Sequence, residues 1–158
     1  ASDKLAQQID LSVAYAKNAQ VVIVNKDATI TADDVKNLTV AVENGSAGNI
    51  VAANDIGVVN LNALPSQMDA LLEVVAGASQ AAIIDLTMAE SVIGKNQFAD
   101  LKIAEGISYG DEVFAVGLRK GSNLTEKLNK FLKDKYADGT MTALLEKYQV
   151  SLNTAALA

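Results

Sequence analysis

The sequence predicts an α/β fold built on a parallel sheet, because short apolar runs alternate with amphipathic stretches along most of the chain. Half of the 158 residues are hydrophobic, so a chain of this length can bury a sizeable core without disulfides. Region 39–104 alternates strand and helix signals and predicts a self-contained wound sheet. One strand signal precedes it at 20–24 and another follows at 112–119, which indicates a lobe joined by two strands to a second part.

The expected strands are β-branched or apolar runs that end at polar or glycine-containing turns. The run at 81–84 is apolar throughout and ends at Asp85. Strands are expected at 20–24, 39–43, 58–61, 81–84, 100–104 and 112–119.

The expected helices begin at capping residues and carry apolar side chains at spacings of three and four. Pro65 fits the first turn of one of them, and Gly77 ends it. The tail 151–158 has little pattern and is expected to be loose. The other helices are expected at 32–38, 47–54, 87–94, 122–136 and 140–149.

The composition excludes several classes of function. The chain has no cysteine and no histidine, which excludes disulfides, thiol nucleophiles, Cys/His zinc sites and a Ser-His-Asp triad. Arg119 is the only arginine, so a bidentate arginine clamp is nearly excluded. A net charge of −6 and 4% aromatic residues argue against a nucleic-acid partner. The sequence contains no apolar run of 18 residues, so it does not predict a membrane-spanning helix. We therefore expect a protein that is not an enzyme and has no cofactor and no metal site.

Candidate binding residues fall at the carboxyl ends of two expected strands, where open parallel sheets bind ligands. Gly45, Ser46 and Ala47 follow the strand 39–43 and open the helix 47–54. Backbone N–H groups at a helix start suit an anion such as a carboxylate, and Ser46 adds a hydroxyl. The alternative is an ordinary serine cap beside a glycine turn, since no Gly-Lys-Ser/Thr follows to form a phosphate loop.

Asp85 and two tyrosines complete the candidate set. A carboxylate after strand 81–84 could receive an ammonium group, and the alternative is a cap for the next helix. Tyr15 and Tyr109 lie near the two connecting strands and offer stacking surfaces or hydroxyls, and the alternative is partly buried scaffold. Only Asp85 lies clearly at a strand end, so hydrolysis by a carboxylate pair is not expected.

Several segments, in order along the chain, resemble one known family. Residues 2–12 resemble T-x-E-R-x-x-x-V-D-F-S, and residues 40–48 resemble V-G-V-Q-x-G-T-T. Residues 77–85 resemble G-x-V-D-A-V-V-x-D, and residues 112–121 resemble E-x-Y-G-I-A-V-R-K-G, with the D-G-T of 138–140 following. The chain thus resembles the extracytoplasmic solute-binding proteins of ABC transporters, in particular family 3, which binds polar amino acids.

The resemblance implies a periplasmic-binding-protein-like fold of type II, with ligand held between two lobes. It assigns 1–24 to a remnant of lobe one and the first hinge strand, 25–112 to a complete lobe two, and 113–158 to the second hinge strand and the C-terminal helices of lobe one. The first β-α units of lobe one have no counterpart here. Leu5 stands where the family carries the arginine that clamps an α-carboxylate, whereas Asp85 matches the acid that takes the α-amino group.

The implied function is binding of a small polar solute such as an amino acid for an ABC importer and its permease. The implied location is periplasmic or cell-surface, with the export signal missing ahead of Ala1. Without the rest of lobe one, the last two helices would expose apolar stripes, so we expect a homo-oligomer or domain-swapped dimer, or else a fragment of a longer product. The alternatives are an interaction or structural protein with a vestigial cleft, and an enzyme on the same fold.

Overall fold

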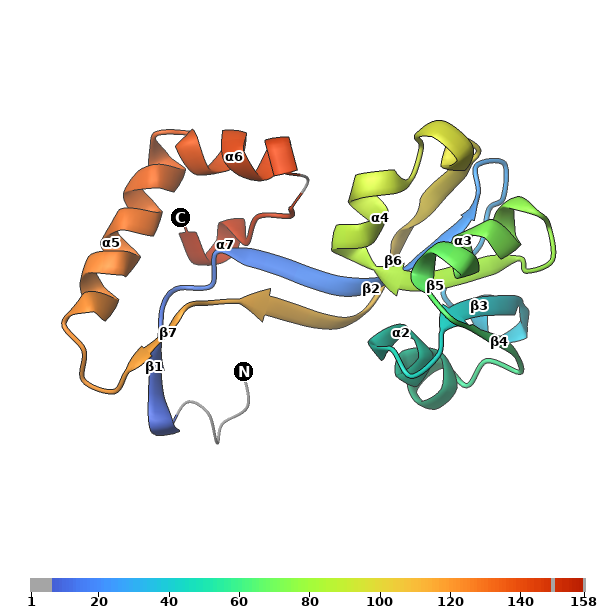
Figure 1. Ribbon diagram of the computed structural model, residues 1–158, viewed down its shortest axis with the longest axis horizontal. Coiled ribbons are helices and arrows are strands. Elements are labelled where there is room, and N and C mark those ends of the chain that lie inside the picture. Colours follow the sequence, from blue (N-terminus) through green and yellow to red (C-terminus); the bar gives the residue numbers. More distant parts are fainter. Residues whose placement is uncertain (1–6, 149, 158) are drawn as a thin grey trace. The chain divides into compact units, whose positions relative to one another are not determined.

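The computed structural model describes residues 7–148 and 150–157 and divides the chain into two compact units. The sheet unit is Ala19–Asp111, and the helical unit is Ala1–Asn18 together with Glu112–Ala158 (Figure 1). Strands β2 (Ala16–Asn25) and β6 (Leu101–Phe114) each contribute residues to both units. None of the described helices is long and apolar enough to cross a membrane.

The sheet unit contains a five-stranded mixed sheet in the order β4-β3-β5-β2-β6. Strand β3 (Thr39–Glu43) pairs in parallel with β4 (Asn60–Leu64) and with β5 (Ala81–Asp85). Strand β2 pairs antiparallel with β5. The predicted α/β fold with parallel strands is confirmed, and the antiparallel β2 makes the sheet a mixed one.

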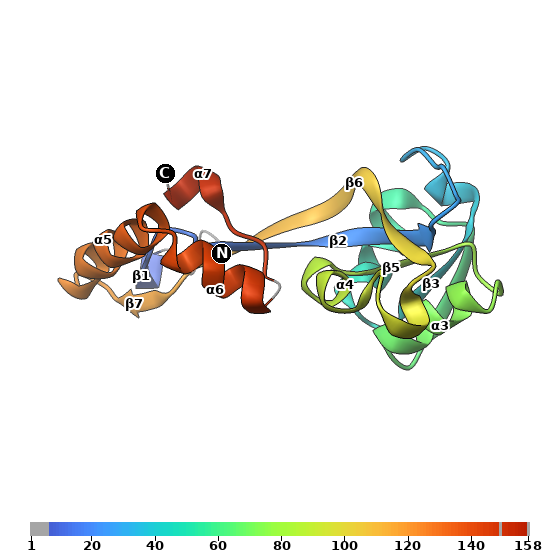
Figure 2. The same ribbon diagram turned by 90° about the horizontal axis from the view of Figure 1, so that it is seen from above.

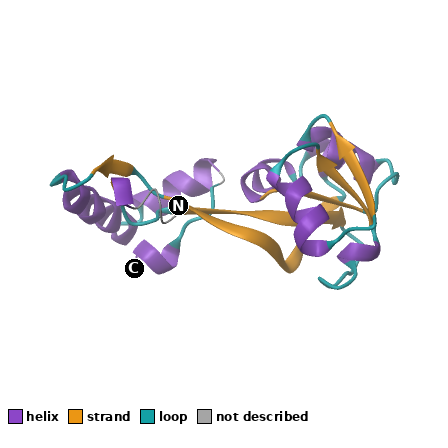
Figure 3. Cartoon of the chain, turned by 90° about the horizontal axis from the view of Figure 1, so that it is seen from below, coloured by secondary structure: helices purple, strands orange, loops and turns teal. Residues whose placement is uncertain are grey.

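Each face of this sheet carries its own apolar core, because successive strand residues point to opposite faces. One core packs against α3 (Gln67–Val75), α4 (Leu86–Val92) and the 3-10 helix η3 (Asn96–Phe98). The other core packs against η1 (Val35–Asn37) and the π-helix η2 (Val51–Ile56), which continues α2 (Ala47–Ile50). Figures 2 and 3 show these helices on both sides of the strands.

Helix α2 approaches the sheet closely because residue 48 is glycine. A Cβ atom at Gly48 would lie 2.8 Å from the carbonyl oxygen of Ile83 and 3.1 Å from Oε1 of Gln20. The first contact is with backbone, which cannot move aside without disturbing β5. Gly48 therefore sets the spacing between α2 and the two central strands.

Several predicted strands differ from those observed. The strands expected at 100–104 and 112–119 are instead a single long β6, which is followed by a short β7 (Gly117–Arg119). Gly106 and Gly110 lie between the two expected strands and have φ of 71° and 61°, a conformation that lets a strand bend and continue. The strand expected at 58–61 begins later, at Asn60, because the Val58 N–H donates to the carbonyl of Ala52 in η2 and so still belongs to the end of that helix.

Two of the predicted helices also have different bounds in the structure. Pro65 lies outside α3, because the Ser66 hydroxyl caps the helix by accepting from the N–H of Asp69 at 3.1 Å. The helix expected at 32–38 is reduced to the short η1. In α4 the observed bounds fall within two residues of the expected 87–94.

The helical unit contains a two-stranded antiparallel ribbon of β1 (Ile9–Leu11) with β7, and the helices α5 (Leu124–Ala137), α6 (Thr140–Tyr148) and α7 (Thr154–Leu157). The prediction of a loose tail is wrong for its described part. Leu152 forms a β-bridge with Ala16, and Leu157 in α7 is 2% exposed. Backbone pairing and burial of one leucine order a segment that has little sequence pattern.

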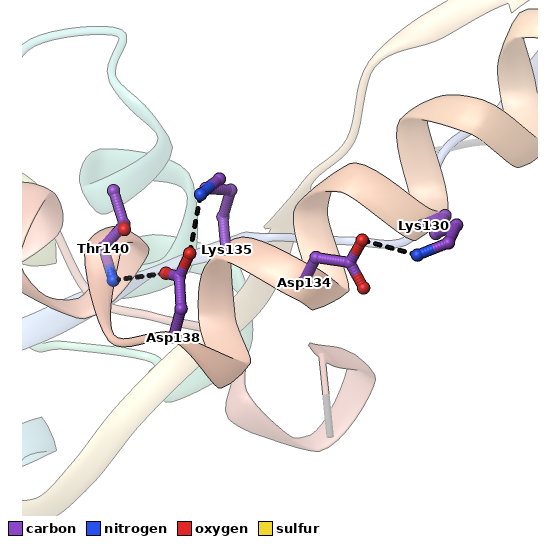
Figure 4. A network of polar contacts seen from close by, with 5 residues as sticks. All are labelled: Lys130, Asp134, Lys135, Asp138 and Thr140. Atoms are coloured by element: carbon purple, nitrogen blue, oxygen red, sulfur yellow. Dashed lines mark hydrogen bonds and ion pairs between the residues drawn. The ribbon is translucent and has the colours of Figure 1, made fainter.

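Polar contacts of Asp138 link the last turn of α5 to the start of α6, and a second ion pair lies within α5 (Figure 4). Lys135 and Lys130 form ion pairs at 2.6 Å with Asp138 and Asp134, respectively. Asp138 also accepts from the N–H of Thr140 at 2.9 Å, so it serves the first turn of α6. Hydrogen bonds from Lys135 and Thr140 lower the pKa of Asp138 to about 2.

We expect Gly48→Ala to lower the free energy of unfolding by about 1–3 kcal/mol, because the added methyl group overlaps the Ile83 carbonyl. Glycine to alanine within a helix normally stabilises by up to ~1 kcal/mol, so the sign of the change is diagnostic. Urea denaturation followed by circular dichroism measures it. A stabilised Gly48→Ala protein would show that α2 does not lie this close to β5.

The Asp138 contacts should make the stability of the α5–α6 turn depend on pH. The pKa of Asp138 is about 2 when folded, against 3.8 for the unperturbed group, so its contribution is complete above pH 4 and is lost as pH falls through 2. Wild type should therefore unfold at a higher temperature than Asp138→Asn at pH 6, and the two should converge near pH 2. A difference in melting temperature that stays constant over this range would contradict the assignment.

Candidate functional site

The candidate site lies at the carboxyl edge of the parallel strands β3 and β5. Their register pairs Val42 with Ile83, so the loop after β3 and the end of β5 reach the same edge. Asp85 is the last residue of β5, and the 45–48 segment follows β3 directly. Ligands of open α/β sheets bind at this edge.

Asp85 occupies the N-cap position of α4, yet its carboxylate makes no capping hydrogen bond. The carboxylate is instead held by two glutamine side chains. Nε2 of Gln20 donates to Oδ1 of Asp85 at 2.7 Å, and Nε2 of Gln67 donates to Oδ2 at 2.6 Å. The backbone N–H of Asp85 donates in return to Oε1 of Gln67 at 3.2 Å. The carboxylate thus lies in a polar, partly buried setting rather than in an ordinary cap.

The 45–48 segment forms a capped helix start. Oγ of Ser46 accepts from the N–H of Asn49 at 3.1 Å, which is the ordinary capping role. Oδ1 of Asn49 accepts from the N–H of Gly45 at 3.0 Å, and Gly45 has a φ of 73° that favours glycine. Among the described residues, the backbone N–H groups of Ala47 and Gly48 have no hydrogen-bond acceptor.

Gly48 and Gln20 connect the helix start to Asp85. The amide of Gln20 directs Oε1 toward Gly48 and Nε2 toward Asp85, so one side chain spans the space between α2 and the end of β5. Gln20 is only 4% exposed. The structure therefore brings Ser46, Ala47 and Asp85 to one edge of the sheet unit through a buried amide.

Neither candidate tyrosine belongs to the segments that form this edge. Tyr15 belongs to the helical unit, where it lines an apolar pocket of about 280 Å³ with residues of α5 and α6. Tyr109 lies in β6 and packs against the core on the α2 face. Burial, and to a lesser extent the charge of Asp33, raises the pKa of Tyr109 above its ordinary value, which fits a scaffold residue.

Sequence reasoning missed Gln20 and Gln67. Gln20 is the residue directly opposite Asp85 in the antiparallel β2–β5 pairing, and that pairing is not visible in either strand alone. Gln67 is the first residue of α3, and a capping signal at Ser66 predicts the helix but not this contact. Leu5, at the position of the family's arginine, lies outside the described residues. Arg119 lies in β7 of the helical unit, opposite Ile9.

The described residues contain no group of three or more histidine, cysteine or acidic side chains placed to hold a metal ion. The chemistry that the site offers is hydrogen bonding and charge: one carboxylate at a strand end, and backbone donors at a neighbouring helix start. An acceptor carboxylate beside backbone N–H donors suits a ligand that has both a cationic and an anionic group.

The chain is similar to a family and to many solved structures. The model of the bacterial extracellular solute-binding proteins, family 3, matches residues 1–151. An ancestral cationic amino acid solute-binding protein is 23% identical, with a TM-score of 0.74 over 94% of this chain and 65% of that one. The unliganded, open L-cystine solute receptor of Neisseria gonorrhoeae is 21% identical, with a TM-score of 0.76 over 93% of this chain and 62% of that one.

A mutant of the arginine-binding protein of T. maritima is 28% identical, with a TM-score of 0.63 over 94% of this chain and 65% of that one. The chain therefore spans somewhat less than two thirds of the length of these structures. No curated protein matches it. The family model covers nearly the whole sequence, and it is the same family that the sequence segments resemble. The chain therefore belongs to the bacterial extracellular solute-binding proteins of family 3.

Proposed function

We propose that this chain is the substrate-binding component of an ABC importer, or part of one, and that it binds a small polar solute such as an amino acid at the carboxyl edge of the sheet unit. The carrying observation is Asp85, whose carboxylate is turned away from its capping role and presented at that edge. Membership of family 3 supports the same function, because that family consists of solute-binding proteins.

Each candidate residue takes a role that its geometry supports. Asp85 accepts the ammonium group of the ligand, and the N–H groups of Ala47 and Gly48 donate to its carboxylate. Oγ of Ser46 is an acceptor in its hydrogen bond with the N–H of Asn49. Its hydroxyl proton is therefore available to the ligand as a further donor. Gly45 lets the chain turn into α2.

The proposal also covers the partner protein and the cellular location that go with the general role of the family. The importer's permease would receive the solute, and the protein would work outside the cytoplasm, in the periplasm or on the cell surface. We also propose that 25–112 acts as lobe two, with the connecting strands on either side of it as hinges.

A second candidate function rests on a separate observation, the apolar surface of the helical unit. Phe131 and Leu144 are 55% and 49% exposed, and both line the pocket of about 280 Å³ between α5 and α6. Exposed apolar groups that cluster in this way mark interaction surfaces. We propose that a second copy of the chain covers them, since one two-fold contact would remove the same surface from water on both copies.

Isothermal titration calorimetry with the L-amino acids tests the main proposal. The protein should bind at least one of them, and Asp85→Ala should abolish that binding because the ammonium group loses its acceptor. Asp100→Ala removes an exposed carboxylate that pairs with Lys26 and should leave binding unchanged. Full binding by Asp85→Ala would overturn the assignment of the site.

Static light scattering tests self-association. The wild type should have about twice the 16.5 kDa mass of one chain, and Phe131→Glu should return it to one, because a charge in the contact cannot be desolvated cheaply. Lys127→Gln lowers the net charge by the same amount on an exposed position of α5 and should remain a dimer. A cooperatively folded wild-type monomer would rule the dimer out.

A further inference from the structure

We infer that Gln67 and Gln20 are positioning residues that orient the Asp85 carboxylate for the cationic group of the ligand, and that they thereby set the preference for solutes carrying an ammonium group. This inference rests on the proposed function and adds two residues to it. It is carried by three hydrogen bonds that join β2, β5 and α3 at Asp85, two of them to its carboxylate and one from its backbone N–H.

Gln20 holds one carboxylate oxygen from within the sheet. It lies directly opposite Asp85 in the β2–β5 register, so the two side chains project to the same face as cross-strand neighbours. Its Nε2 reaches Oδ1 of Asp85 at 2.7 Å. At 4% exposure, and with its Oε1 against Gly48 of α2, the Gln20 side chain has little freedom to turn away.

Gln67 holds the other oxygen from the helix on the opposite face. Its carboxamide contacts both ends of Asp85, donating to Oδ2 at 2.6 Å and accepting from the backbone N–H at 3.2 Å. A planar amide that pairs with two points on one residue fixes distance and orientation together. The Ser66 cap holds the first turn of α3, which carries Gln67, in place.

Donors on both oxygens restrict rotation of the carboxylate about its Cβ–Cγ bond. A charged acceptor that is held in its binding orientation loses less freedom when the ligand arrives, so affinity for the cationic group rises. This orientation of Asp85 does not affect ligand groups that contact other parts of the site.

The test compares Gln67→Met with wild type on two ligand pairs: L-arginine with 5-guanidinopentanoate, and L-glutamine with glutaramate. The second member of each pair lacks only the α-ammonium group. Gln67→Met keeps the length of the side chain and removes both hydrogen bonds. We expect it to weaken binding of the amino acid by about tenfold while the affinity for the des-amino acid stays within about twofold.

The matched control is Gln80→Met, at the opposite end of β5, where Oε1 of Gln80 accepts from the N–H of Thr39. It should leave the preference for the ammonium group unchanged. Equal weakening of both members of a pair by Gln67→Met would assign Gln67 a general structural role and overturn the inference. Unchanged binding of both would overturn it as well.

A ligand-free measurement separates this inference from the proposed function. In the 15N–1H NMR spectrum, the side-chain NH2 signals of Gln20 and Gln67 can be assigned with Gln20→Met and Gln67→Met. Asp85→Ala should move both pairs of signals, because it removes their acceptor, and should leave the Gln80 signals in place. If neither pair moves, the inference fails whatever the protein binds; if both move and wild type binds no amino acid, the orientation of Asp85 stands and the proposed solute is wrong.

Discussion

The antiparallel pairing of β2 with β5 is the interaction on which the sheet unit depends. Residues 20–24 of β2 pair with 81–85 of β5 in the centre of the sheet. Their side chains point alternately to the two faces and pack into two separate cores. Val21 and Ile23 face α3 and α4, whereas Val22 and Val24 face η1 and η2. The last pair in this register is Gln20 with Asp85, so the same ladder that builds the cores also builds the candidate site.

The site is therefore coupled to the packing of the fold. Gly48 allows α2 to lie on the Ile83 carbonyl and the Gln20 amide, and Gln20 in turn holds Asp85. Burying an amide of this kind costs free energy unless it is hydrogen-bonded, and the Asp85 carboxylate at the end of β5 accepts from its Nε2. Changes in core packing near α2 would therefore reach the carboxylate through a single side chain.

The two units differ in how completely they bury their apolar residues. The sheet unit covers its central strands on both faces, with Val22, Ile23 and Val40 at 0% exposure. In the helical unit, Leu132 and Leu157 are buried, while Leu124, Phe131 and Tyr148 are more than half exposed. A two-stranded ribbon with three helices offers too little sheet surface to cover these side chains. This contrast explains why the helical unit carries the apolar pocket.

Local patterns in the sequence predicted much of the fold. β3 matches the expected strand 39–43 residue for residue, and β5 extends the expected 81–84 by Asp85 alone, because a bounded apolar run is a local signal. The expected gap between strands 100–104 and 112–119 was wrong, because Gly106 and Gly110 bend the strand without ending it. The tail was also mispredicted, since its order comes from pairing with Ala16, a residue more than a hundred positions earlier.

The α/β class, the resemblance to family 3 and the position of Ser46 and Asp85 after apolar strands follow from local sequence signals, because capping and periodicity act between near neighbours. The contacts that hold Asp85 depend on the tertiary structure. Gln20 is 65 residues away from it and Gln67 is 18, and neither contact follows from spacing along the chain. Strand register and the close approach of α2 bring them together, and both are set by long-range packing.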